Sequence, residues 1–154
     1  MKKNKLQIGK LITSIIICEG VGILGSFITV SSIQTWYQFL NKPFFNPPSW
    51  IFGPVWTILY LLMGFSLYLI WIRNRRKLTI FWIQLGLNAA WSFLFFGLHS
   101  PLLAFIDILV LLITIIITIK TFYKIYAPAG LILLPYLAWV GFATILNFSI
   151  LILN

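Results

Sequence analysis

The chain has 154 residues, of which 61% are hydrophobic, 18% aromatic and 8% charged, and its mean hydropathy is +1.03. So few polar side chains cannot cover the surface of a water-soluble domain of this size, so the composition excludes a soluble enzyme and predicts an integral membrane protein. The net charge is +9, from 11 basic and 2 acidic residues, and its meaning depends on where these residues lie.

Five long apolar runs follow one another along the chain, at about residues 11–31, 50–72, 79–98, 102–123 and 130–152. Each run is close to the roughly 20 residues that cross a hydrocarbon core about 30 Å thick. Backbone groups in lipid must form hydrogen bonds within their own segment, so the runs are expected to be α-helices. The predicted fold class is an all-α membrane protein, a five-helix bundle in which residues 1–154 form one domain.

The basic residues alternate between the connections of these runs. Ten of them lie before the first run, between the second and third, or between the fourth and fifth: Lys2, Lys3, Lys5, Lys10, Arg73, Arg75, Arg76, Lys77, Lys120 and Lys124. The opposite connections hold only Lys42 and His99. Because cytoplasmic loops retain Lys and Arg, this pattern predicts a cytoplasmic N-terminus and an outer C-terminus. The charge is therefore a topology signal, and no nucleic-acid partner is expected.

The first run carries two features of interest. Cys18, Gly22 and Ser26 form a stripe of small residues at four-residue spacing, which suits close helix packing. Glu19 lies beside this stripe, and Asp107 is a second acid, in the fourth run. Acids within the membrane are functional candidates, although each is equally open to a structural role with a polar partner. Cys18 is the only cysteine, so neither a disulfide nor a metal site is expected.

The connection between the first two runs, about residues 32–49, is long and contains three prolines. Proline restricts its own backbone and that of the preceding residue, so this connection is not one continuous helix, although Gln34 to Leu40 has room for a short one. It also carries five aromatic side chains: Trp36, Tyr37, Phe39, Phe44 and Phe45. Two interpretations remain open, an aromatic belt at the membrane surface and a semi-rigid lid over a cavity at the outer end of the bundle.

The third run has two stripes on nearly opposite sides of the expected helix. One stripe, expected to line an internal pocket because polar amides avoid lipid, consists of Gln84, Asn88, Trp91 and Phe95. The other is rich in small residues and consists of Gly86, Ala90, Phe93 and Gly97. Small residues favour close packing, and the partner helix belongs either to the same bundle or to a second subunit.

Two further runs present similar faces. In the fifth run, one face carries Tyr136, Trp139, Ala143 and Asn147, and in the second run one carries Trp50, Pro54 and Thr57, with Tyr60 at its flank. Aromatic walls with a few polar groups suit a large, flat and mostly apolar ligand. The alternative is ordinary bundle packing in which the aromatic rings fill the core.

Three stretches of the chain are WYQFLNKPFFNPPSWIFGPVWTILYLLMG, QLGLNAAWSFLFFG and PYLAWVGFATILNFSILILN. They resemble, in this order, the signature loop with the second helix, the third helix and the fifth helix of one membrane-protein family. This is the tryptophan-rich sensory protein or translocator protein family (TspO/MBR), also called peripheral benzodiazepine receptors. The resemblance runs from about Trp36 to the C-terminus. The basic loops and small size favour a bacterial plasma membrane.

This resemblance implies a five-helix fold, often dimeric, whose cavity is closed by the first loop. It implies porphyrin binding, with protoporphyrin IX as a ligand rather than an intrinsic cofactor, and binding of isoquinoline carboxamide or benzodiazepine drugs. The pocket positions of the family fall on Trp50, Tyr60, Asn88, Trp91, Tyr136, Trp139 and Ala143, and its lid on Pro43 and Pro47. The expected partners are membrane lipids and a second copy of the chain, packed through Gly86, Ala90 and Gly97.

The resemblance leaves the role open among tetrapyrrole sensing, transport and light-dependent breakdown. For breakdown, Trp50 and Trp139 are the expected photochemical residues, since an indole can donate an electron or react with singlet oxygen. The alternative is a proton-coupled exporter that uses Glu19. The cholesterol motif of vertebrate members is incomplete here, because Leu146 is present but Phe148 and Ile152 occupy its other two positions.

Overall fold

The structure is a computed structural model that describes residues 7–154, so Lys2, Lys3 and Lys5 of the charge pattern lie outside the described residues. Within this range the chain is helical and has no strand. The α-helices are α1 (Ile8–Thr35), α2 (Ser49–Trp71), α3 (Thr79–Ser92), α4 (Pro101–Ile125), α5 (Ala127–Leu131) and α6 (Leu134–Leu153). Short turns are η1 (Tyr37–Phe39), η2 (Arg75–Lys77) and the π-helical η3 (Phe93–Gly97).

Five helical stretches are long and apolar enough to cross a membrane, which confirms the predicted fold class. The main departure from prediction is in the last run, which is two helices, α5 and α6, rather than one. Pro135 lies in the first turn of α6 and has no N–H to continue the hydrogen-bond ladder from α5. The N–H of Leu133 instead donates to the carbonyl of Gly130, 3.1 Å away, and closes the turn between the two helices.

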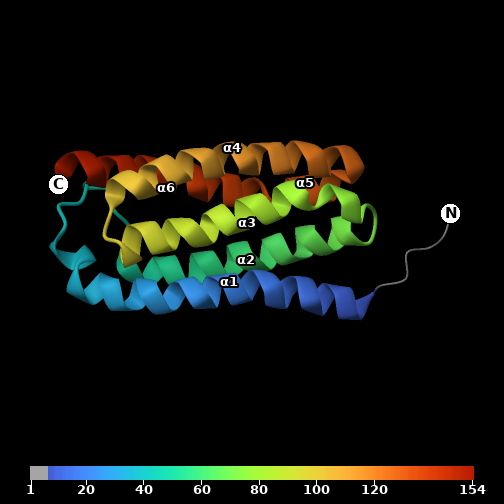
Figure 1. Ribbon diagram of the computed structural model, residues 1–154, viewed down its shortest axis with the longest axis horizontal. Helices are drawn as coiled ribbons and strands as arrows, with labels where there is room; N and C mark the ends of the chain where they lie inside the picture. The colour runs from blue at the N-terminus through green and yellow to red at the C-terminus, as the bar shows by residue number, and fades with distance from the viewer. Residues whose placement is uncertain (1–6) are drawn as a thin grey trace.

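The long helices lie side by side along one axis, and the start of α1 and the C-terminus are at opposite ends (Figure 1). Helix α1 packs against α2 and α3, and α4 packs against α3, α5 and α6. The helices therefore follow one another around the bundle in the order α2, α1, α3, α4 and α6. Helix α2 meets the last run through α5, at the N-terminal end of the molecule.

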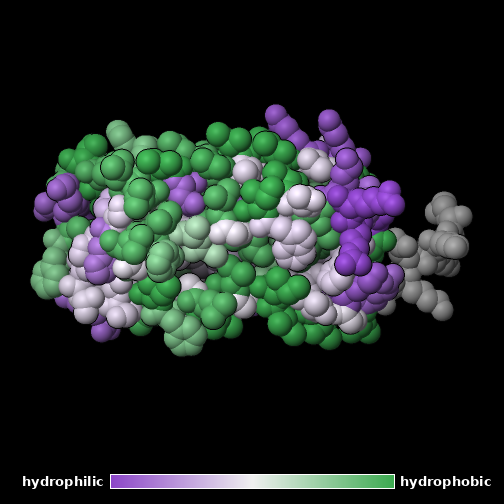
Figure 2. Space-filling model, in the orientation of Figure 1, coloured by the Kyte–Doolittle hydropathy of each residue, from purple (hydrophilic) through white to green (hydrophobic). Residues whose placement is uncertain are grey.

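Hydrophilic side chains gather at the end of the molecule where the described chain begins, next to a broad apolar surface (Figure 2). The exposed basic residues of the α2–α3 connection, Arg73, Arg75, Arg76 and Lys77, belong to this end. The guanidinium of Arg73 lies over the ring of Tyr126, 3.6 Å from its centre, and joins this connection to the start of the last run. One end of the bundle is thus basic, as the alternation of charges predicted.

The connection between α1 and α2 lies at the same end as the C-terminus (Figure 1). It is tied there by two asparagines, since the N–H of Asn41 donates to Oδ1 of Asn154 at 2.9 Å and Nδ2 of Asn154 donates back to the carbonyl of Asn41 at 3.0 Å. The aromatic rings of this connection do not all follow one of the two interpretations left open, the aromatic belt at the membrane surface and the lid over a cavity. Tyr37 is buried, whereas Phe39 and Phe44 are exposed.

Candidate functional site

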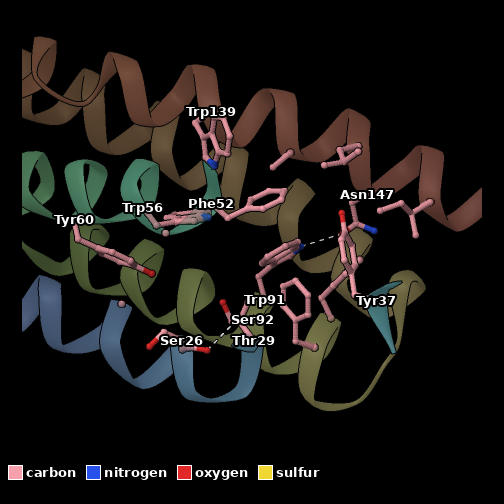
Figure 3. Close-up of a pocket in the computed structure, with 18 residues that line it drawn as sticks. Ser26, Thr29, Tyr37, Phe52, Trp56, Tyr60, Trp91, Ser92, Trp139 and Asn147 are labelled. Carbon is pink, nitrogen blue, oxygen red and sulfur yellow. Dashed lines mark hydrogen bonds between the residues drawn. The ribbon is translucent and has the colours of Figure 1, made fainter. Parts of the chain in front are cut away.

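A cleft opens in the half of the bundle that carries the α1–α2 connection. It encloses about 810 Å³, including its open mouth. Its lining comes from α1, η1, α2, α3, η3 and α6, and the residues that matter below are Gly22, Ser26, Thr29, Tyr37, Phe52, Gly53, Trp56, Tyr60, Trp91, Phe95, Trp139, Ala143 and Asn147. Figure 3 shows aromatic side chains from α2, α3 and α6 directed toward the same space.

Three indoles from three different helices form the walls of the cleft: Trp56 on α2, Trp91 on α3 and Trp139 on α6. Neighbouring rings hold each of them in place. Trp91 stacks on Phe95 with ring centres 5.2 Å apart, and Trp56 lies 5.6 Å from Tyr60. The rings of Phe52 and Trp139 meet edge to face, with their centres 6.1 Å apart. Such stacked and edge-to-face pairs fix the orientation of the indoles that a flat ligand would contact.

The wall formed by α1 is made of small residues. Gly22, Gly25, Ser26 and Thr29 line it, and none of them fills the space between α1 and the indoles. Gly22 is required by its neighbour, since a Cβ added there would lie 2.5 Å from Cδ2 of Tyr60. Of the small stripe predicted on this helix, Cys18 is buried and Gly22 packs against an aromatic ring on α2, whereas Ser26 is exposed.

A buried hydrogen-bond network closes the deep end of the cleft. The hydroxyl of Tyr60 donates to Oδ1 of Asn88 at 2.5 Å, and Nδ2 of Asn88 donates to the hydroxyl of Tyr136 at 3.0 Å. Tyr136 in turn donates to Oε1 of Gln84 at 2.8 Å. The chain of bonds joins α2, α3 and α6 at a depth where water is excluded, so it fixes how these helices are rotated relative to one another.

A second polar link lies nearer the mouth. Nε1 of Trp91 donates to Oδ1 of Asn147 at 3.0 Å, and Nδ2 of Asn147 donates to the carbonyl of Pro101 at 2.9 Å (Figure 3). One amide thus satisfies an indole on α3 and a carbonyl at the start of α4. The N–H of Trp91 is thus paired, which leaves the face of this indole rather than its polar edge available to the cleft.

Tyr37 forms the outer edge of the cleft and is the ring by which the α1–α2 connection covers it. Its hydroxyl donates to Oδ1 of Asn46 at 2.7 Å, and burial raises its pKa to about 12. The ammonium of Lys42 lies 4.9 Å from the centre of the Tyr37 ring. The mouth of the cleft therefore has a positive charge beside it.

The structure brings most of the sequence-predicted site residues together. Tyr60, Trp91, Trp139 and Ala143 line the cleft. Asn88 and Tyr136 lie below it, as members of the buried network, and contact the cleft through Tyr60. These positions agree with the faces predicted for the third and fifth runs.

Three predicted residues lie elsewhere. Trp50 is in the first turn of α2 with 73% of its surface exposed and does not line the cleft, and Pro43 and Pro47 are half-buried in the connection without lining it. The expected face of the second run is thus corrected. Phe52, Trp56 and Tyr60, at four-residue spacing, are partly or fully buried and line the cleft, whereas Pro54 and Thr57 are exposed and do not line it.

The sequence interpretation missed Phe52, Trp56 and the cleft-facing residues of α1. A signal for Trp56 was available, because it lies four residues before Tyr60 and therefore on the same helix face. The two membrane acids both carry a buried oxygen without a hydrogen-bond partner among residues 7–154, Oε1 of Glu19 and Oδ2 of Asp107. In the described part of the chain no cluster of His, Cys, Asp and Glu is suited to a metal ion.

Comparison with known proteins places these observations in a family. The sequence model of the TspO/MBR family matches residues 14–153. The chain is 48% identical over 153 residues to the Tryptophan-rich protein TspO of Archaeoglobus fulgidus, which covers 97% of this chain and 99% of that protein. It is 37% identical over 122 residues to the Translocator protein of Homo sapiens, covering 75% and 72%, and 35% identical over 121 residues to the Tryptophan-rich sensory protein of Cereibacter sphaeroides, covering 77% of each.

Proposed function

We propose, from the premise that the chain belongs to the TspO/MBR family, that its cleft binds tetrapyrroles of the protoporphyrin IX type. Isoquinoline carboxamide and benzodiazepine drugs, which are also flat and aromatic, would occupy the same space. The observation that carries the proposal is the arrangement of Trp56, Trp91 and Trp139 on three walls of one apolar cleft. Ligand sites of this kind are lined mainly by apolar and aromatic side chains with a few polar groups.

The polar groups around the cleft favour one orientation of a porphyrin. Lys42 lies beside Tyr37 at the mouth, whereas the deep end is closed by neutral side chains, Tyr60 and Asn88. The two carboxylates of protoporphyrin therefore point toward Lys42 and water, and the macrocycle lies among the indoles. This orientation keeps the carboxylates hydrated or paired, since an unpaired charge in an apolar site is strongly disfavoured.

The test is a dark titration of the purified protein with protoporphyrin IX, followed by the absorption band of the porphyrin. This signal belongs to the ligand, so replacing an indole does not remove the reporter. Saturable binding is expected in the wild type, and the combined variant Trp56→Phe/Trp139→Phe is expected to bind about tenfold more weakly, because aromatic contacts contribute about 1 kcal/mol each beyond the area they bury.

The matched control is Trp82→Phe, which makes the same chemical change on α3 at a residue that is 41% exposed and outside the cleft. This variant is expected to bind as the wild type does. No saturable binding by a folded wild-type protein would refute porphyrin binding. Equal losses in the control and in the combined variant would refute the cleft as the binding site.

A second candidate function is light-dependent breakdown of the bound porphyrin, favoured by the presence of three indoles in the walls of one cleft. Trp139 keeps the photochemical role expected from the sequence, and Trp56 replaces the exposed Trp50. The porphyrin would absorb the light, and an indole in contact with it would donate an electron or react with singlet oxygen. In illuminated samples we expect Trp50→Phe to leave the decay rate of bound porphyrin unchanged and Trp139→Phe to lower it.

We also propose a bacterial plasma membrane location with the basic end of the bundle in the cytoplasm. The support is the set of exposed basic residues in the α2–α3 connection. A homodimer is proposed through α3 and η3, where Gly86 on α3 and Gly97 on η3 are exposed and Ala90 is half-buried, so that a second helix can approach closely. A cysteine in place of Gly86 is expected to cross-link two copies of the chain in such a dimer. A control cysteine in place of Ile113, an exposed residue on α4, is not.

A further inference from the structure

A second, smaller space lies between α1 and α2, next to the deep half of the cleft. It measures about 380 Å³ including its opening, and we refer to it as the side compartment. Its lining residues are Glu19, Gly22, Ile23, Ser26, Gly53, Trp56, Thr57 and Tyr60. Ile23, Ser26 and Thr57 are exposed, so the compartment opens on the lipid-facing surface between the two helices.

The side compartment adjoins the cleft and shares five lining residues with it. Gly22, Ser26, Gly53, Trp56 and Tyr60 line both spaces. Two of these five are glycines, and a Cβ built at Gly53 would meet no atom within 4 Å. A ligand whose ring system lies against Trp56 in the cleft therefore has room to extend a substituent into the side compartment.

Glu19 is the feature that gives this compartment its chemistry. It supplies the one carboxyl among the lining residues and lies near the middle of α1, a helix long and apolar enough to cross a membrane. Its Oε1 is buried and accepts no hydrogen bond from residues 7–154. A buried polar atom without a partner is rare in a folded protein, and a carboxyl in the membrane is expensive unless it meets a donor.

We propose that the side compartment is a subsite for a cationic or N–H donor group of the ligand, and that Glu19 accepts its hydrogen bond. The inference rests on the proposed function in taking the cleft as the ligand site. It adds that charge orients a flat aromatic ligand in the cleft: cationic or N–H donor groups lie at Glu19, and carboxylates lie at the mouth beside Lys42. Aromatic amines would accordingly bind more tightly than neutral rings of the same shape.

The experiment compares two probes with the same ring system, 9-aminoacridine, which is cationic at neutral pH, and acridine, which is neutral. Each is titrated into purified full-length protein, and quenching of tryptophan fluorescence gives its dissociation constant. In Glu19→Gln the ratio of the constant for 9-aminoacridine to that for acridine is expected to rise about tenfold, which is the effect of losing one hydrogen bond to a charged group.

Asp107→Asn is the matched control. Asp107 also has a buried oxygen without a partner among the described residues, but it lines neither the cleft nor the side compartment. The same ratio is expected to stay at its wild-type value in this variant. An unchanged ratio in Glu19→Gln, or an equal rise in Asp107→Asn, would overturn the proposal.

A second variant tests the space rather than the charge. Thr57 lines the side compartment but not the cleft, and its side chain is exposed, so Thr57→Phe fills the compartment without crowding the core. Thr57→Phe is expected to raise the ratio of the two dissociation constants as Glu19→Gln does. A ratio equal to that of the wild type would mean that the amino group of 9-aminoacridine binds outside the side compartment, which would overturn the proposal. Titration of the wild type with protoporphyrin IX in parallel tests the proposed function separately. If protoporphyrin IX does not bind but the ratio of dissociation constants depends on Glu19, porphyrin binding is refuted and the subsite is retained.

Discussion

Nε1 of Trp91 donates a hydrogen bond to Oδ1 of Asn147 across a distance of 3.0 Å, and this bond joins α3 to α6 at the edge of the cleft. The same amide donates to the carbonyl of Pro101 at the start of α4. Three helices that are separated along the chain thus meet at one side chain. Because that side chain is 1% exposed, neither bond can be replaced by water without opening the bundle.

Replacing Asn147 by Leu keeps the number of side-chain heavy atoms and removes both bonds. We expect Asn147→Leu to lower the free energy of unfolding by about 1–2 kcal/mol, the range found for hydrogen bonds between membrane helices. Thermal unfolding in detergent measures the change. Ser149→Ala is the control, since the Ser149 hydroxyl bonds only to the carbonyl of Ile145 in its own helix, and a loss of equal size there would contradict the prediction.

The hydroxyls of Tyr136 and Tyr60 differ in the number of bonds they make. That of Tyr136 both accepts from Asn88 and donates to Gln84, whereas that of Tyr60 donates once, to Asn88. Tyr136→Phe leaves two buried groups without a partner and is expected to destabilise the protein by about 1–3 kcal/mol. Tyr60→Phe is expected to cost less. Chemical unfolding of both variants measures the two losses of stability. A loss in Tyr60→Phe that equals or exceeds that in Tyr136→Phe would contradict the hydrogen bonds assigned to this network.

Gly22 and Gly20 provide a matched pair on α1. A Cβ at Gly22 would lie 2.5 Å from Cδ2 of Tyr60, whereas one at Gly20 would meet nothing within 4 Å. Gly22→Ala is expected to push the Tyr60 ring toward the cleft, to destabilise the protein by about 1–3 kcal/mol and to weaken porphyrin binding. Gly20→Ala is expected to be neutral or slightly stabilising, because alanine favours helix. Porphyrin titration and thermal unfolding test both, and identical behaviour of the two variants would refute the close contact.

Burial raises the pKa of the Tyr37 hydroxyl from 10.0 to about 12. A folded-state pKa above the unfolded value means that the neutral hydroxyl contributes stability fully below pH 10. This contribution is lost as the pH rises from 10 to 12. We therefore expect the α1–α2 connection to become sensitive to protease over this interval, as the bond from Tyr37 to Asn46 fails.

Tyr37→Phe is the control for this pH dependence. The difference in tyrosinate absorbance between wild type and variant isolates the titration of Tyr37. Its midpoint is expected near 12, and protease sensitivity in the variant should not change over the same interval. A midpoint at the ordinary value of 10 would show that the ring is open to water and that the connection does not cover the cleft.

Two of the faces that line the site could be predicted from the sequence because polar side chains mark them. Amides in α3 and α6, Gln84, Asn88 and Asn147, avoid lipid, so they indicate the inner side of each helix and the aromatic rings that share it. Helix α2 has no buried amide in the half that lies near the α1–α2 connection. Its indoles, Trp50 and Trp56, are alike in composition, and the first is exposed while the second lines the cleft.

The sequence by itself determined the five spans and their helical state, because hydrocarbon leaves the backbone no other way to satisfy its hydrogen bonds. It also determined the alternation of basic connections. Only the tertiary structure decided how α1 and α2 are rotated, that Gly22 faces Tyr60, and that Asn41 pairs with Asn154, 113 residues away. The reason is that lipid is as apolar as the interior of the bundle, so hydrophobicity does not distinguish the two sides of a membrane helix and packing between helices must.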